Sequence, residues 1–448
     1  MMSRPISRRH FLNRVGLAGG VGALSAAGWS RVFGANERLR VAAIGVSGKG
    51  WSDHTSVAKS PYVEIVTICD IDEGPNFLGR GAKQYPNANR QTDWRKVLDK
   101  PQDIDAVIVS TPDHMHAPIT LAALQLGKHV YCQKPLSHTV FEARQMRLAA
   151  QKARATTQMG NQIQSHTVYR TAVKLVHDGT IGKVKEVFSW QSGPMRWWLV
   201  DERPAGSDPI PATLHWDDWL GVAPTRPFKE RIYHDFSWRA WQDFSSGQLG
   251  DFACHILDPV FMALDLTAPT TIRAEAPPLP KELWTRSAKV EYEFPGTART
   301  TGKTLKLTWY DGEGHKPPRE ALGLAENIAI PPAGSLLIGE KGSLLIPHVA
   351  QPRLLVDNAF VKLPIEPVPA RDHYVSWADA CRGEDKTTSH FDYSGPLTET
   401  VLLGTIAIRN PEQVLQWDTD GLKITNHARA NEMLKKPYRK GWEPAWVS

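Results

Sequence analysis

The chain has 448 residues, of which 41% are hydrophobic and 22% are charged, and this is enough for two domains with sizeable cores. The formal net charge of +6 comes mainly from five arginines within residues 1–35, which contain no acid, so the remainder of the chain is close to neutral. Because that remainder has no basic run and no alternation of basic and aromatic residues, nucleic acid is not an expected partner.

The N-terminal segment has the pattern of an export signal. Ser7-Arg8-Arg9-His10-Phe11-Leu12 precedes a mild apolar stretch, Val15–Ala27, which is shorter than the roughly 20 residues that cross a membrane. The pattern resembles a twin-arginine signal, so residues 1–35 are predicted to be a signal peptide recognised by the twin-arginine export machinery. The expected location is the periplasm or cell envelope. Since that pathway carries folded proteins, any cofactor would be bound tightly before export.

A short apolar strand, Val41–Ile44, leads into a turn rich in glycine. Gly45, Gly48 and Gly50 have the spacing of a dinucleotide-binding turn, in which backbone amides approach a pyrophosphate at a helix N-terminus. Ser47 occupies the second glycine position of the usual G-x-G-x-x-G pattern, and its hydroxyl is able to donate to a phosphate. We therefore predict that Gly45, Ser47, Gly48 and Gly50 bind the pyrophosphate of a dinucleotide.

The next strand ends in an acid. Val63–Cys69 is followed by Asp70, which lies 20 residues after Gly50. At that spacing a carboxylate reaches the ribose hydroxyls of a dinucleotide. Because Asp70 and Asp72 would repel the additional phosphate of NADP, the expected cofactor is NAD(H).

Strands and helices continue to alternate up to residue 160. Asp105–Ser110 and His129–Cys132 predict buried strands, and Ala117–Leu126 and Val140–Lys152 predict helices, the second with a capping box at its start. This order predicts a Rossmann domain, a doubly wound parallel sheet, over residues 36–160. Residues 161–448 are predicted to form a substrate-binding and oligomerisation domain of the α+β class.

The loop Thr111-Pro112-Asp113-His114-Met115-His116 follows a strand, where ligands bind in open α/β sheets. Asp113, His114 and His116 have side chains that are able to ligate a metal. The sequence offers no further ligand cluster, however, and the loop stands where a nucleotide is expected. A nucleotide-binding loop is favoured, and no metal is predicted.

Several motifs together resemble the glucose–fructose oxidoreductase / inositol dehydrogenase / rhizopine-catabolism (Gfo/Idh/MocA) family. They are Thr111-Pro112-x-x-x-His116, Gly127-Lys128-His129-Val130 and Lys134-Pro135. The resemblance implies a second domain with a large open, mostly antiparallel sheet, and a homo-oligomer. It also implies that Lys134 lies beside nicotinamide and substrate. The residues that it implies for cofactor binding are Thr111, Pro112, His116, Gln133, Lys134 and Gln162. Where the family usually has Glu-Lys-Pro, Gln133 replaces the glutamate and removes a negative charge.

Gly247–His255 contains the remaining candidates for catalysis. If this segment is helical, Asp251 and His255 are four residues apart on one face, close enough to act on one substrate. The pattern resembles the family's Asp-x-x-x-His signature, in which the histidine removes the hydroxyl proton as hydride leaves the same carbon. Histidine titrates near neutral pH, which suits a general base. The predicted catalytic residues are therefore Lys134, Asp251 and His255.

Tryptophans crowd the region between Trp190 and Trp241, interleaved with polar and charged residues. About half are expected in the core, and the others offer flat faces on which a sugar ring stacks. The predicted substrate-binding residues are Trp197, Arg239 and Trp241, together with Asp251 and His255. The loop Asp201–Pro211 is predicted to act as a lid.

Three functions fit these residues. The first is an NAD(H)-dependent oxidoreductase that acts on a secondary hydroxyl of a sugar, glycoside or cyclitol. The second is a redox-assisted glycosidase or lyase, in which oxidation of a ring hydroxyl acidifies the adjacent C–H, so that a substituent is eliminated before re-reduction with the same NAD. The third is a noncatalytic sugar- or nucleotide-binding protein, which the retention of Lys134 and His255 disfavours.

Overall fold

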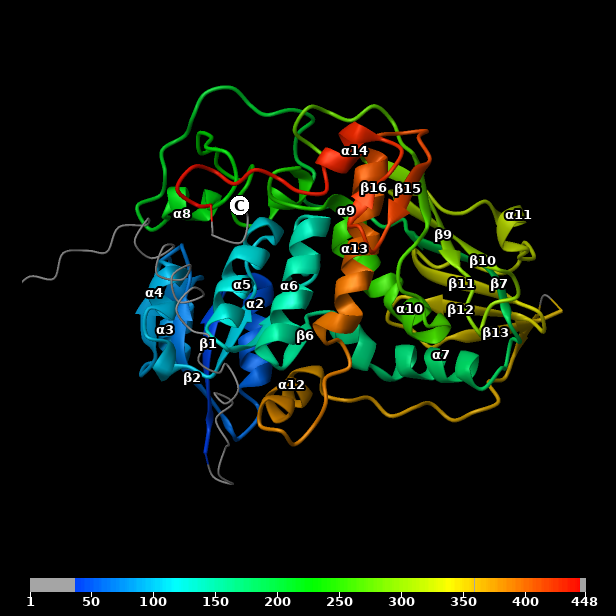
Figure 1. Ribbon diagram of the computed structural model, residues 1–448, viewed down its shortest axis with the longest axis horizontal. Helices are drawn as coiled ribbons and strands as arrows, with labels where there is room; N and C mark the ends of the chain where they lie inside the picture. The colour runs from blue at the N-terminus through cyan, green and yellow to red at the C-terminus, as the bar shows by residue number, and fades with distance from the viewer. Residues whose placement is uncertain (1–36, 358, 444–448) are drawn as a thin grey trace, which may run out of the picture.

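The structure is a computed structural model and describes residues 37–357 and 359–443. The predicted signal peptide, residues 1–35, lies outside this part of the chain. Two sheets lie side by side with helices between and around them (Figure 1). Within the described residues, no helix is both long and apolar enough to cross a membrane.

The first sheet has six parallel strands in the order β3-β2-β1-β4-β5-β6, so the predicted doubly wound sheet is confirmed. The strands are β1 (Leu39–Ile44), β2 (Val63–Cys69), β3 (Asn89–Gln91), β4 (Ala106–Val109), β5 (His129–Cys132) and β6 (Thr157–Met159). All four residues of β4 are buried, as expected where helices cover both faces. The strand order reverses between β1 and β4, and ligands bind outside the carboxyl ends of strands at such a point.

Five helices connect these strands. They are α2 (Gly48–Val57), α3 (Leu78–Gln84), α4 (Trp94–Leu98), α5 (His116–Gln125) and α6 (Val140–Ala153). The predicted capping box at the start of α6 is present, because the Thr139 hydroxyl accepts from the Glu142 amide while the Glu142 carboxylate accepts from the Thr139 amide. The reciprocal pair satisfies two of the amide donors that a helix N-terminus leaves open.

The second sheet has ten strands in the order β14-β13-β12-β11-β7-β10-β9-β8-β15-β16. The strands are β7 (Val184–Gln191), β8 (Thr271–Glu275), β9 (Ser287–Pro295), β10 (Thr304–Gly312), β11 (Ala333–Gly339), β12 (Ser343–Pro347), β13 (Arg353–Val356), β14 (Ala359–Val361), β15 (Leu415–Asp418) and β16 (Lys423–Ile424). Only the β7–β10 pair is parallel among these described strands, which confirms the mostly antiparallel sheet.

The second half also contains helices. They are α7 (Thr167–His177), α8 (Trp216–Leu220), α9 (Gly247–Ile256), α10 (Asp258–Leu264), α11 (Arg319–Leu322), α12 (His373–Cys381), α13 (Phe391–Ile408) and α14 (Ala428–Glu432). Helix α13 is buried almost throughout and packs against α6, α9 and β8, so it runs between the two sheets (Figure 1). Helix α12 returns to the first sheet, where Trp377 packs against Tyr131 of β5.

Residues 192–246, between β7 and α9, form what we call the cap. Its core is a cluster of aromatic side chains, and it reaches across to the carboxyl end of β2. There the Glu73 amide donates to the Thr213 carbonyl (2.9 Å) and the His215 amide donates to the Ile71 carbonyl (2.9 Å). The cap therefore covers the edge of the first sheet at which a nucleotide is expected.

Candidate active site

A cavity of about 710 Å³ lies between the carboxyl edge of the first sheet, the cap and α9. Its volume is within the range of cofactor and small-molecule sites. It brings together most of the residues that the sequence predicts for cofactor and substrate: Gly45, Ser47, Gly48, Asp70, Thr111, Pro112, Gln133, Lys134, Gln162, Trp197, Arg239, Asp251 and His255. One continuous space thus joins the glycine-rich turn to the predicted catalytic residues.

The glycine-rich turn is closely packed at Gly45 and has open space at Gly48. A Cβ at Gly45 would lie 2.5 Å from the Ser110 carbonyl oxygen, and Gly45 has φ +79°. A Cβ at Gly48 would meet nothing within 4 Å. The turn therefore leaves open space at the N-terminus of α2, where amides and the helix dipole favour a phosphate.

Gly50 does not line the cavity. A Cβ there would lie 1.9 Å from the Gly45 carbonyl oxygen, so this glycine allows α2 to pack against the turn. The prediction that Gly50 binds the cofactor is therefore corrected: it supports the turn from behind. Close helix–strand packing is the usual role of the third glycine in this pattern.

Of the two acids after β2, only Asp70 lines the cavity. Its carboxylate accepts from the backbone amides of Val46 (3.0 Å) and Asp72 (3.2 Å), which fix it beside the glycine-rich turn. The Asp72 carboxylate instead accepts from the Gly74 amide (2.8 Å) and lies 3.1 Å from Nε2 of His234 in the cap. Asp72 therefore holds the cap, and Asp70 is the one of the two acids that faces the cavity.

Several buried polar atoms of the cavity residues have no hydrogen-bond partner within the described chain. They include Thr111 Oγ1, Gln162 Oε1 and His255 Nδ1. Buried polar atoms in native proteins are normally paired, so such a set indicates a polar ligand. A dinucleotide has phosphates, ribose hydroxyls and a carboxamide, and the turn, Asp70 and these atoms fit it.

The catalytic candidates meet at the other end of the cavity. Lys134, two residues after β5, donates through Nζ to the carbonyl (2.6 Å) and Oδ1 (2.5 Å) of Asp251 on α9. Nε of Arg239 lies 3.6 Å from the same Oδ1. Although burial opposes ionisation, the two cations hold the pKa of Asp251 at about 2. Asp251 is therefore a carboxylate at every physiological pH.

His255 lies one turn after Asp251 on α9 and lines the same end of the cavity. Burial, together with the positive charge of Lys134, holds the pKa of His255 well below its ordinary value. The imidazole is therefore neutral near pH 7 and is able to accept a proton.

Two further predicted residues lie outside the cavity. Each ring nitrogen of His116 lies 2.7 Å from a backbone carbonyl oxygen, that of Pro135 or that of Thr111, so the ring packs between two cavity loops instead of lining the cavity. Trp241 is 1% exposed and donates to the Ile232 carbonyl (2.8 Å) within the aromatic core of the cap. Trp241 is thus a packing residue and not a substrate contact.

The cap lines the cavity with residues other than the predicted lid. Asp201–Pro211 contributes none of the lining, whereas Trp219, His234, Phe236 and Trp238 do. The guanidinium of Arg239 lies 4.3 Å from the ring centre of Trp238 and 4.5 Å from that of Phe236. Only tertiary packing decides which aromatic residues of this dense segment face inward, so the sequence had no signal that separated them.

Asp113 is a cavity residue whose role the sequence did not reveal. Its carboxylate accepts from the backbone amide (3.0 Å) and hydroxyl (3.2 Å) of Ser246, the residue before α9. Asp113 thereby joins the loop after β4 to the helix that carries Asp251 and His255. Burial raises the pKa of Asp113 to about 7. Its partner Ser246 lies 133 residues further along the chain, so no local sequence motif indicates this contact.

Known proteins resemble the chain over both domains. Residues 39–161 match the model of an oxidoreductase family described as an NAD-binding Rossmann fold, and residues 165–302 match the C-terminal α/β domain of the same family. Together these matches extend over more than half of the chain.

Two curated relatives align with parts of the chain. A levoglucosan dehydrogenase of Pseudarthrobacter phenanthrenivorans is 27% identical over 188 residues, which are 42% of this chain and 40% of the relative. An alpha-N-acetylgalactosaminidase of Shewanella oneidensis is 27% identical over 172 residues, 37% of each protein. The chain thus spans about two fifths of the length of the curated relatives that it matches.

The fold also resembles a solved structure, that of levoglucosan dehydrogenase in complex with NADH and levoglucosan. The TM-score is 0.59 at 17% identity, covering 85% of this chain and 99% of the other. At this identity the likeness concerns the fold alone.

We expect Asp113→Asn to flatten the pH dependence of stability. Because the folded state holds a proton on Asp113 up to about pH 7 while the unfolded chain releases it near pH 4, this residue lowers stability as the pH rises. The variant retains an acceptor for Ser246 but does not titrate. As the pH rises from 5 to 7, its free energy of unfolding should therefore fall by about 2 kcal/mol less than that of the parent. Urea unfolding at both pH values measures this, and equal losses would contradict the assignment.

Proposed function

Since the chain belongs to the Gfo/Idh/MocA family of oxidoreductases, we propose that it uses NAD(H) to oxidise or reduce a secondary hydroxyl of a sugar, glycoside or cyclitol. One observation carries the proposal: a single cavity has a dinucleotide turn with Asp70 at one end and Lys134, Asp251 and His255 at the other. The sugar-acting name of the levoglucosan dehydrogenase relative supports the substrate class. The aromatic rings of Trp197, Phe236 and Trp238 provide faces for a sugar ring.

In this proposal His255 accepts the proton of the reacting hydroxyl, because its imidazole is neutral near pH 7. The ammonium of Lys134, held by Asp251, favours the negative charge that develops on the oxygen as the proton leaves. Asp251 fixes Lys134 and also lies 3.6 Å from Nε of Arg239, whose guanidinium has further donors for neighbouring hydroxyls. Bound NAD would supply the acceptor of the hydride from the same carbon.

We also propose that the cofactor is bound tightly. The cap lies over the carboxyl end of β2, where its backbone joins residues 71–73 and Asp218 pairs with Arg95 (2.8 Å). Release of the adenosine end would require these contacts to break, which slows exchange. A retained cofactor suits the second candidate, redox-assisted cleavage of a glycoside, and the alpha-N-acetylgalactosaminidase relative favours that candidate too.

The two candidates are separated by incubating the purified protein with sugars and glycosides, in parallel without and with added NAD. Release of the glycosidic substituent with no net oxidation supports redox-assisted cleavage. Formation of a ketone that depends on added NAD supports a dehydrogenase. If the panel leaves both substrates and bound nicotinamide unchanged, the protein is a binding protein and the proposal is wrong.

The location outside the cytoplasm and the homo-oligomer remain part of the proposal. Arg8 and Arg9 carry the expected export pattern. Replacing both by lysine should leave the precursor in the cytoplasm, as cell fractionation would measure. An unchanged exported fraction would contradict the twin-arginine route.

We expect His255→Ala to lose turnover by about 10²–10⁴-fold while it keeps its bound nicotinamide, because a positioned general base contributes this much to rate. His348, which lies 5.9 Å from His255 between ring centres, provides a matched control as His348→Ala. Steady-state rates and the nicotinamide content per chain measure both effects. If His255→Ala retains near-normal turnover, another group is the base.

A further inference from the structure

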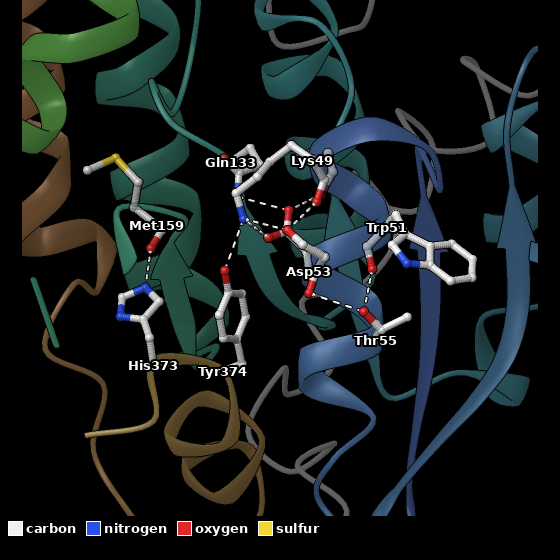
Figure 2. A network of polar contacts seen from close by, with 10 residues as sticks. Lys49, Trp51, Asp53, Thr55, Gln133, Met159, His373 and Tyr374 are labelled. Carbon is white, nitrogen blue, oxygen red and sulfur yellow. Dashed lines mark hydrogen bonds and ion pairs between the residues drawn. The ribbon is translucent and has the colours of Figure 1, made fainter. Parts of the chain in front are cut away.

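A buried carboxylate stands directly behind the cavity wall. Asp53, on α2, is fully buried, and Oδ2 accepts from the Ser110 hydroxyl (2.8 Å) and from Nε2 of Gln133 (2.9 Å). Its Oδ1 pairs with the ammonium of Lys49 (Figure 2). The three donors come from α2, from the residue after β4 and from the residue after β5. Asp53 therefore joins three segments that meet at the switch point of the sheet.

Asp53 acts on the cavity through these donors. Lys49, Ser110 and Gln133 line the cavity, whereas Asp53 does not. The amide of Gln133 packs directly against the backbone of Gly160, where a Cβ would lie 2.2 Å from its Nε2. The position of the Gln133 amide is thus set by Asp53 on one side and by the backbone at Gly160 on the other.

Lys49 is held in the same network. Its ammonium donates to Tyr374 Oη (3.0 Å) on α12 and to the Ser52 hydroxyl (3.1 Å), in addition to its pair with Asp53 (Figure 2). Burial opposes the charge of both partners and raises the pKa of Asp53, whereas Asp53 keeps the pKa of Lys49 above the ordinary value. Lys49, in the glycine-rich turn, thus pairs with a carboxylate and also donates a hydrogen bond to a residue of α12.

The network explains the departure from the family motif. At position 133 this chain has an amide where Glu-Lys-Pro has a carboxylate, and that amide donates to the carboxylate of Asp53 on α2. We propose that Asp53 is a positioning residue for the cofactor, which supplies from α2 the buried negative charge that a glutamate at 133 would supply. Asp53 holds Gln133 and Lys49 at the wall that faces the cofactor. The inference rests on the proposed function, since it presumes that NAD(H) occupies the cavity.

The test is a double-mutant cycle read by the release of NADH from the purified protein. Gln133→Glu places a second carboxylate within hydrogen-bonding distance of Asp53, and two such charges repel. We expect NADH release to become at least about tenfold faster, equivalent to the loss of one hydrogen bond to a charged group. In the Asp53→Asn background the new carboxylate meets an amide, so the same change should speed release by no more than about threefold.

Nicotinamide fluorescence after dilution into NAD-free buffer follows the release. The matched control is Gln151→Glu, because Gln151 also donates to an aspartate, Asp392, at an exposed site outside this cavity. It should leave the release rate unchanged. The cycle overturns the inference if Gln133→Glu has the same effect in both backgrounds.

Folding of the variants is informative as well. A Gln133→Glu chain that folds only together with Asp53→Asn supports the coupling, and a double variant that also fails to fold contradicts it. If the parent binds NADH but the cycle shows no coupling, only the role of Asp53 is wrong. A parent that binds no NADH overturns both this inference and the proposed function.

Discussion

The ion pair between Lys134 and Asp251 connects the two halves of the molecule where chemistry is expected. Lys134 follows β5 of the first sheet, Asp251 lies on α9 of the second half, and their side chains are 13% and 16% exposed. Removing either partner would leave the other charge largely buried without compensation, which is strongly unfavourable. The pair therefore holds His255, one helical turn from Asp251, at a fixed position beside the cavity.

Around this pair, other buried polar groups join segments that are distant in the sequence. Asp113 links the loop after β4 to the start of α9, and Asp53 links α2 to the strand ends. Each carboxylate accepts from donors of another segment, so the energetic cost of its burial is offset only when both segments are in place. The links of Asp113 and of the Lys134–Asp251 pair form only when the two halves are assembled, whereas the donors to Asp53 all lie in the first half.

Local patterns in the sequence predicted the parts of the site that depend on short spacing. The glycine-rich turn and the Asp251–His255 pair are each fixed by the geometry of one turn or one helix, and Asp70 is fixed by one strand–helix–strand unit. Roles that depend on long-range packing were not predictable, and Trp241 and His116 illustrate this. Trp241 and Trp197 lie in the same tryptophan-rich segment, but Trp241 does not line the cavity whereas Trp197 does. His116 follows the strand end where ligands bind, yet each of its ring nitrogens lies against a backbone carbonyl oxygen.

The central claim is that a sugar carbon and a nicotinamide exchange hydride within this one cavity. The most direct measurement adds sugars and glycosides deuterated at ring carbons to the protein as purified, and then analyses the nicotinamide from samples quenched at intervals during the first turnover, before any re-reduction returns the deuteride to the sugar. We predict deuterium on the recovered nicotinamide for a reacting sugar, and none with the His255→Ala variant. Conversion of a sugar without any transfer of deuterium to the nicotinamide would contradict the account.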